Sequence, residues 1–341
     1  MNHKIIDCQV HCAAPSIDAL LPYMKAGYAE RVIRTAFQLP PAESHPGGGS
    51  SKGYASPAEV AASLGDEVSG VVLVPHQAMS TANWTDTRLC AVYVAALNAY
   101  MVDHWLAEDD RFHLAIAVSP HEAELAAAEI ERHAGNPRVV AATMPMLAPH
   151  LGSPFYRPII EAAARHNLTL IVHPGGKEGT ILGAPALGAI GPRYHGEYEC
   201  LIWHVAAVNI SSIIYDGVFV EFPDLKIAFA DFGMDWVGPT MWRLDAEWRA
   251  LRIDIPWVVE PPSTYLGRNV RIIVGDAEGI PQDALAKLVS LAPATSLLFG
   301  SNSPFAKDRK WLDTLPTEVR EQLCWRNAAD TFRSGIAALA A

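Results

Sequence analysis

Histidine, aspartate and amide side chains stand at the ends of several short apolar runs in this sequence. Gln9 and His11 end the first run, His173 ends a run near the middle of the chain, and Asp231 ends the next one. Asn302 follows the last run. Imidazole and carboxylate groups can transfer protons or bind a divalent metal, whereas amides can hydrogen-bond a carboxylate or an oxyanion. We therefore interpret His11, His173 and Asp231 as one catalytic cluster, with Gln9 and Asn302 as substrate-binding residues.

Three further residues are candidates for substrate binding. His76 follows the second apolar run, His204 lies near the start of a helical pattern, and Trp236 lies five residues after Asp231, where it could form the wall of an aromatic pocket. Each of these residues, taken alone, fits a structural role equally well.

The apolar runs that carry these residues predict eight strands. The runs are continuously apolar rather than alternating, which is typical of strands buried on both faces of a parallel sheet. They span residues 4–10, 70–75, 112–119, 139–146, 168–173, 226–231, 270–274 and 296–301. Helical patterns lie between them, so the sequence predicts a single (β/α)8 barrel, with a doubly wound open sheet as the alternative. In such a barrel the polar residues at the strand ends share one rim, and we expect Gln9, His11, His173, Asp231 and Asn302 to converge there within a few ångströms.

Two segments do not fit the repeat of strand and helix. Residues 38–56 include the stretch PPAESHPGGGSSKG, and residues 175–200 are rich in glycine. Both follow predicted strands, so we expect them to be long loops over the catalytic face of one domain that spans residues 1–341.

Composition excludes several classes of protein. The chain has 341 residues, of which 50% are hydrophobic, and its net charge of −11 argues against a nucleic-acid partner. No secretory leader, membrane-length apolar run, phosphate-binding glycine loop or G-x-S-x-G elbow is visible in the sequence. The number of cysteines, five, is odd, and none of them form a C-x-x-C pair, so we expect free thiols and a cytoplasmic protein.

Several longer stretches resemble the amidohydrolase-2 group of the amidohydrolase superfamily. They are residues 6–11, FYRPIIEAAARHNLTLIVHPGG (155–176), YDGVFVEFPDLKIAFADFGMDWVGPTMWRLD (215–245), FGSNSP (299–304) and RNAADTF (326–332). The resemblance implies a (β/α)8 enzyme with a small-molecule substrate and association into a homo-oligomer. The group includes decarboxylases of aromatic and related acids, hydratases and lactone hydrolases.

The chain departs from that group at four site positions. Gln9 stands where relatives carry His, Asp or Glu, and Asn302 stands where many relatives have a metal-binding Asp. Phe305 replaces a His of the strand-eight signature, and Asp231 stands where relatives carry His or Glu. Neutral amides bind hard or borderline cations weakly. The sequence therefore favours a site without a tightly bound metal; the alternative is Zn²⁺ or Mn²⁺, with His11, His173 and Asp231 as candidate ligands.

These observations support three hypotheses. The first is an enzyme that acts on a small carboxylated or aromatic substrate by acid–base chemistry, through decarboxylation, C–C cleavage, hydration, dehydration or cyclisation. The second is a metal-dependent hydrolase or decarboxylase with an altered ligand set. The third is a binding barrel without catalytic activity.

Overall fold

The computed structural model describes residues 4–37, 53–175, 194–275, 277, 280–305, 309–333 and 336. Most of the two segments expected to cover the catalytic face, residues 38–52 and 176–193, lie outside the described residues.

Eight parallel strands form one sheet at the centre of the molecule, in chain order. They are β1 (Ile5–Cys12), β2 (Val68–Pro75), β3 (Phe112–Ala117), β4 (Val139–Pro145), β5 (Thr169–His173), β6 (Ile227–Ala230), β7 (Val270–Val274) and β8 (Leu297–Phe299). Nearly all residues of these strands are buried, as the continuous apolar runs predicted. Because β1 and β8 also meet, through a bridge between Val10 and Ser303, the sheet closes into the predicted (β/α)8 barrel rather than an open sheet.

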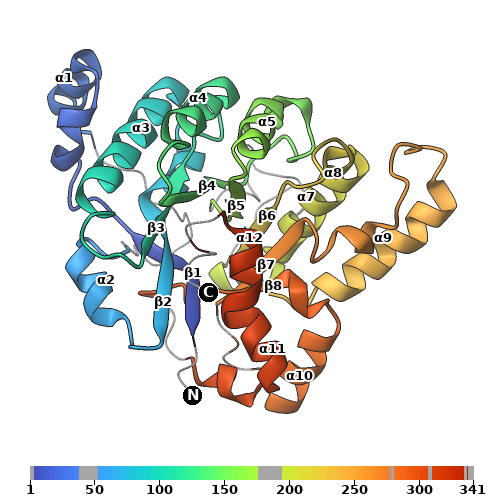
Figure 1. The fold of residues 1–341 in the computed structure, drawn as a ribbon. Helices are drawn as coiled ribbons and strands as arrows, with labels where there is room; N and C mark the ends of the chain where they lie inside the picture. Colours follow the sequence, from blue (N-terminus) through green and yellow to red (C-terminus); the bar gives the residue numbers. More distant parts are fainter. Residues whose placement is uncertain are drawn as a thin grey trace.

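Helices surround the strands, as Figure 1 shows. They are α1 (Ala26–Arg34), α2 (Pro57–Ser63), α3 (Thr87–His104), α4 (Ala123–His133), α5 (Arg157–Arg165), α6 (His195–Leu201), α7 (Trp203–Tyr215), α8 (Val218–Glu221), α9 (Val237–Leu251), α10 (Gln282–Ser290), α11 (Thr317–Glu321) and α12 (Asn327–Thr331). The predicted helical patterns correspond to α3, α4, α5, α7, α9 and α10. A π-helical turn at Gln322–Arg326 connects α11 to α12.

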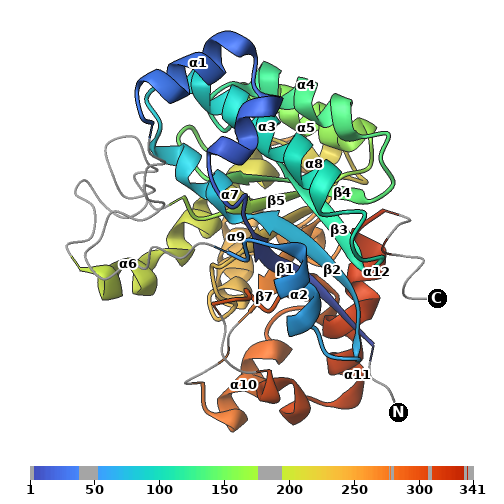
Figure 2. The ribbon, with the colours of Figure 1, turned by 90° about the vertical axis from the view of Figure 1, so that its left-hand side faces the viewer.

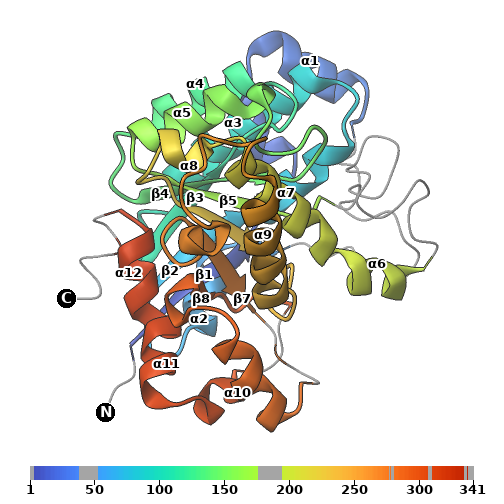
Figure 3. The same ribbon diagram turned by 90° about the vertical axis from the view of Figure 1, so that its right-hand side faces the viewer.

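The two ends of the barrel differ in what covers them. Helix α6 lies at one end, and α12 lies at the other end (Figures 2 and 3). The expectation of a loop throughout residues 175–200 is therefore wrong at its end, where residues 195–200 form most of α6. That helix begins with a capping box in which Glu197 accepts a hydrogen bond from the Tyr194 backbone.

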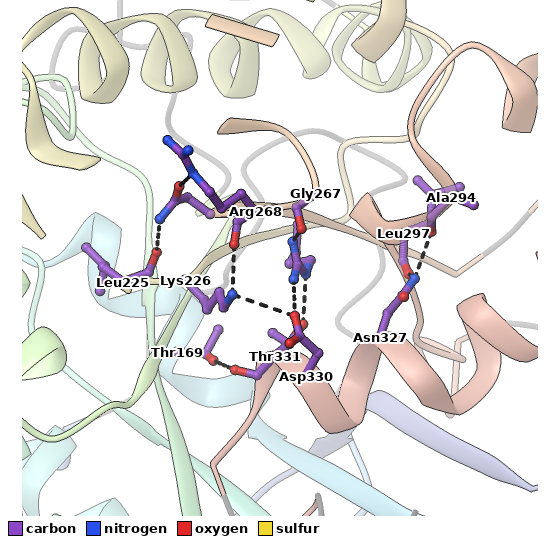
Figure 4. Close-up of polar contacts among 12 residues, drawn as sticks. Thr169, Leu225, Lys226, Gly267, Arg268, Ala294, Leu297, Asn327, Asp330 and Thr331 are labelled. Atoms are coloured by element: carbon purple, nitrogen blue, oxygen red, sulfur yellow. Dashed lines mark hydrogen bonds and ion pairs between the residues drawn. The ribbon is translucent and has the colours of Figure 1, made fainter. Parts of the chain in front are cut away.

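Polar contacts fasten α12 to the amino ends of the strands (Figure 4). Arg271, on β7, is only 1% exposed; its Nη2 lies 2.6 Å from Asp330 Oδ2, its Nε donates to Thr331 Oγ1, and its Nη1 donates to the Gly267 carbonyl. Asn327 Nδ2 donates to two carbonyl groups that flank the start of β8. These bonds join α12 to β7 and to the start of β8.

None of the helices in the described ranges is long and apolar enough to cross a membrane. All five cysteines are free thiols, and four of them are buried, as expected from their pattern in the sequence.

Candidate active site at the carboxyl end of the barrel

Strand β1 supplies two side chains to the centre of the site. Its pairing with β2 shifts between Asp7 and Val10, so that one extra residue of β1 is accommodated by a bulge. Bulges of this kind redirect side chains beside functional sites. Gln9 and His11 both point into the barrel, where Gln9 Nε2 lies 3.1 Å from His11 Nε2.

Strand β5 ends in an imidazole that faces the same point. His173 Nδ1 donates to the Pro174 carbonyl oxygen, 3.0 Å away, which directs Nε2 toward the interior. His173 Nε2 lies 2.7 Å from Asp231 Oδ2 and 3.2 Å from Gln9 Nε2. Four of the five residues expected to converge are thus within hydrogen-bonding distance of one another.

The surroundings of Asp231 and His11 lower the pKa of both groups, which leaves the two with different charges. Burial acts to raise the pKa of Asp231, but the adjacent His173, through its charge and its hydrogen bond, outweighs burial and lowers this pKa to about 2. Burial lowers the pKa of His11 well below its usual value, and the neighbouring His76 and His173 lower it further. Asp231 is therefore an anion and His11 a neutral imidazole near neutral pH.

Two site residues have a backbone conformation that is uncommon for side chains other than glycine. Asp231 follows β6 with φ of +63°, and Asn302 follows β8 with φ of +53°. Asn and Asp are the non-glycine residues that tolerate this region best, and such strain gathers at functional sites. The residue type at these two positions is therefore constrained by the backbone as well as by the chemistry.

The donor atoms fit a divalent cation. His11, His173 and Asp231 each offer one ligand atom, and these atoms lie within 4.8 Å of one another. Two imidazoles and a carboxylate suit Zn²⁺ or Mn²⁺. In addition, the Gln9 amide lies beside both imidazoles and the Asn302 side chain hydrogen-bonds His11, so two amides border the donor set. The structure therefore favours the metal alternative over the metal-free site that the sequence favoured.

A cavity of about 460 Å³ opens above this cluster. Its base is formed by His11, His76, His173, Asp231 and Asn302. Its wall combines apolar side chains, such as Met79, Ile202, Met234, Ile280 and Phe305, with the carboxylates of Glu199 and Asp235. Among the described residues that line it there is no Lys or Arg. The cavity is within the range of sizes that suits a small organic ligand.

The three weaker candidates lie in different places. His76 lines the cavity, with its ring centroid 4.9 Å from that of His11. His204 instead stacks on Trp203, with centroids 3.6 Å apart, and Trp236 is buried with its indole N–H donated to the Phe232 carbonyl. His204 lies on α7 and Trp236 directly precedes α9, and neither is among the described residues that line the cavity.

Sequence reasoning missed three acidic residues near the site. Glu199 on α6 and Asp235 before α9 line the cavity. Asp7 lies within the apolar run of β1, where burial raises the pKa of its carboxyl group. The only signal for Asp7 is a charged residue in a run that otherwise predicts a buried strand.

The barrel and its rim of imidazole, carboxylate and amide groups define an enzyme of lyase or hydrolase type. A family model described as Amidohydrolase (Amidohydro_2) matches residues 6–334, and the chain belongs to this family. The resemblance drawn from the sequence is thereby confirmed. A comparison with curated protein sequences found no match.

Solved structures share the fold at low sequence identity. The chain is similar to an amidohydrolase of Mycobacterium avium subsp. paratuberculosis K-10 (TM-score 0.71, 16% identity, 97% of this chain and 99% of that one). It is also similar to a 5-carboxyvanillate decarboxylase of Sphingomonas paucimobilis (TM-score 0.66, 20% identity, 97% and 99%). A third similar structure is a dihydroxybenzoic acid decarboxylase of Polaromonas sp. JS666 with bound manganese and the inhibitor 2-nitroresorcinol (TM-score 0.67, 16% identity, 96% of each chain). At these identities the likeness establishes the fold alone.

Proposed function

We propose that this protein is a Mn²⁺- or Zn²⁺-assisted lyase that removes the carboxyl group of a small hydroxylated aromatic acid. The observation that carries the proposal is the set of three donor atoms within 4.8 Å of one another at the base of a partly apolar cavity. The chemistry of the similar decarboxylases and the manganese bound in one of them support the same conclusion.

His11, His173 and Asp231 would bind the cation, with the side-chain amides of Gln9 and Asn302 beside them. When bound, a divalent cation supplies positive charge that offsets a substrate carboxylate or phenolate. This charge matters here because the described residues that line the cavity include no Lys or Arg. The apolar side chains of the wall, such as Met79 and Phe305, would pack against the ring of the substrate.

Decarboxylation needs one proton to be delivered. The bond between the ring carbon and the carboxyl group breaks, its electron pair stays on the ring carbon, carbon dioxide leaves, and the carbon takes up a proton. Because the three ligand groups are engaged, we assign this proton transfer to His76, the cavity imidazole outside the set of three donors.

A second candidate mechanism uses the same pocket without a cation. It is favoured by the 2.7 Å separation of His173 Nε2 and Asp231 Oδ2, which matches a shared proton, and by the Gln9 amide nitrogen between the two imidazoles. In this mechanism the pair of His173 and Asp231 transfers the proton, and Gln9 and Asn302 hydrogen-bond the substrate.

The test is decarboxylation in D₂O of a panel of benzoic acids with a hydroxyl group next to the carboxyl group. We expect product that carries one deuterium at the carbon that lost the carboxyl group, with activity lost after metal chelation and restored by Mn²⁺. His76→Gln should then lower the rate by about 10²-fold or more, whereas Met79→Leu, a matched change in the cavity wall, should have little effect.

Full activity in chelator, with His76→Gln active and Asp231→Asn inactive, would favour the second mechanism. Absence of carbon dioxide release from the whole panel, with and without metal, would contradict both.

A further inference from the structure

The barrel has a weak point where its first and last strands meet. Neighbouring strands from β1 to β8 are joined by runs of paired residues. Between β1 and β8, the backbone contacts among the described residues are the bridge of Val10 with Ser303 and the bond from His11 N to Ser303 O, 2.8 Å long. We call this junction the seam. Gln9 and His11 lie on one side of it, and Asn302 lies on the other.

One side chain spans the seam below those residues. Asp7 is 2% exposed, and its Oδ1 accepts hydrogen bonds from Ser301 N at 2.8 Å and from Gln9 N at 3.2 Å. Ser301 immediately precedes Asn302 in the chain. The same Asp7 oxygen therefore holds the backbone of Gln9 on one strand and, on the other, the backbone of the residue before Asn302.

The local geometry leaves little freedom for other arrangements. A bulge leaves a backbone N–H without a partner in the neighbouring strand, and this N–H needs another acceptor. In the β1 bulge, Asp7 Oδ1 accepts the hydrogen bond from Gln9 N. On the other strand, a Cβ on Gly300 would lie 2.7 Å from Gln9 Cβ and 2.4 Å from Ile273 Cγ2. β8 thus approaches β1 closely beside Gln9, at a distance that only glycine allows.

We infer that Asp7 is a positioning residue of the active site, which fixes Gln9 and Asn302 relative to each other across the seam. It acts through the two backbone amides that it binds. Because hydrogen bonds to a carboxylate are stronger than those between neutral groups, Asp7 substitutes for the strand pairing that β1 and β8 lack. This inference concerns the same site as the proposed function and shares its assignment of Gln9 and Asn302.

The inference can be tested with substitutions at Asp7 and at two other positions. Asp7→Ala removes the acceptor, whereas Asp7→Asn keeps an oxygen that can accept from both amides. Asn327→Ala is the matched control, since Asn327 also secures β8, through the Leu297 carbonyl, but at the amino end of the barrel. Gly300→Ala would press on Gln9 directly from the opposite strand, so it is the positive control for a displaced Gln9. Asp7→Val, which also lacks the acceptor, replaces Asp7→Ala if that variant does not fold.

The first measurement is the long-range ¹H–¹⁵N spectrum of the histidine rings in metal-free protein, assigned with His11→Gln and His173→Gln. Asp7→Ala or Gly300→Ala should shift the ring nitrogens of His11 and His173, both of which contact Gln9. Asp7→Asn and Asn327→Ala should leave them in place. The second measurement is Mn²⁺ titration, in which Asp7→Ala should bind at least tenfold more weakly than the control.

Unchanged ring signals in Asp7→Ala, beside signals that shift in Gly300→Ala, with stability lost as in Asn327→Ala, would overturn the inference and leave Asp7 a purely structural residue. If the ring signals shift but the unmodified protein binds no Mn²⁺, the positioning role stands and the metal-assisted function fails.

Discussion

Buried polar side chains around Arg271, at the amino end of the barrel, are bonded differently from those of the site at the carboxyl end. At the amino end, Arg271 hydrogen-bonds through all three of its guanidinium nitrogens, and the Asn269 and Asn327 amides each donate to two carbonyls. At the carboxyl end, Gln9 Oε1 and His11 Nδ1 are buried without a hydrogen bond of normal geometry in the described chain, as is the amide oxygen of Asn302.

This difference separates stability from function within one sheet. Buried polar groups in native proteins normally make hydrogen bonds. Unmade hydrogen bonds together with backbone strain at one rim therefore indicate a ligand-binding site, where stability is lower. The amino end binds the last helix to the strands. The carboxyl end keeps donor and acceptor atoms available for a ligand. Changes at the two ends should therefore have separable effects.

The largest effect is expected from Asp231→Asn. Both candidate mechanisms need the Asp231 charge, so the decarboxylation rate should fall by about 10²- to 10⁴-fold. The fold should persist, because asparagine tolerates the positive φ at this position. Steady-state kinetics with the substrate found in the panel measure the rate, and a thermal unfolding curve measures the stability. A rate within threefold of that of the unmodified protein would show that Asp231 has no part in the mechanism.

Arg271→Met should give the complementary result at the amino end. It removes a buried cation and leaves the Gly267 carbonyl and the Thr331 hydroxyl without their donor. We expect the free energy of unfolding to fall by about 2–3 kcal/mol, with Mn²⁺ affinity unchanged in the folded protein. Denaturant unfolding measures the loss. Arg243→Met, at an exposed arginine of α9, is the control and should change stability by less than about 0.5 kcal/mol.

The contrast between the ends also explains how much the sequence could predict. Continuous apolar runs identify β1 to β8 because burial on both faces leaves a direct compositional signature. His11, His173 and Asp231 could be predicted as a cluster because a barrel brings all strand ends to one rim.

Other features depend on tertiary structure. The contact of Asp7 with Ser301 joins residues from opposite ends of the chain. The positive φ of Asp231 and Asn302 leaves no unique signal in their residue types. Trp236 shows the converse, because nearness to the end of β6 in the sequence does not place its side chain in the cavity. The homo-oligomer implied by the family resemblance stays a prediction.

A smaller effect is expected from Gln9→Glu combined with Asn302→Asp. The double variant adds two anionic oxygens beside the His11 and His173 imidazoles, so Mn²⁺ or Zn²⁺ affinity should rise at least about tenfold, or ~1.4 kcal/mol. It should also lower decarboxylation, since the amides could no longer hydrogen-bond the substrate as neutral donors. Calorimetric titration of both proteins measures the change. Equal affinities would show that the amides do not limit metal binding.

The smallest effect is a pH dependence of stability at the carboxyl end. The pKa of His11 is lowered in the folded protein, so the unfolded chain binds a proton first as the pH falls below about 6.5. The metal-free protein should therefore lose up to about 1.4 kcal/mol per pH unit from this residue below that pH. Urea unfolding between pH 7 and pH 5 measures this slope, which His11→Gln should reduce. The Asp231 pKa of about 2 adds stability that is lost only as the pH falls below about 4. A slope unchanged by His11→Gln would contradict the charge assignment.

We infer that His11, His173 and Asp231 form a cation site at the carboxyl end of the barrel. Titration with Mn²⁺, followed by electron paramagnetic resonance, tests this most directly. Metal-stripped protein is titrated alongside His173→Gln, which removes an imidazole ligand, and Arg271→Met, which disturbs the opposite end of the barrel. We expect one bound Mn²⁺ per chain in the unmodified protein and in Arg271→Met, and its loss in His173→Gln. No binding in the unmodified protein, or equal binding in His173→Gln, would contradict it.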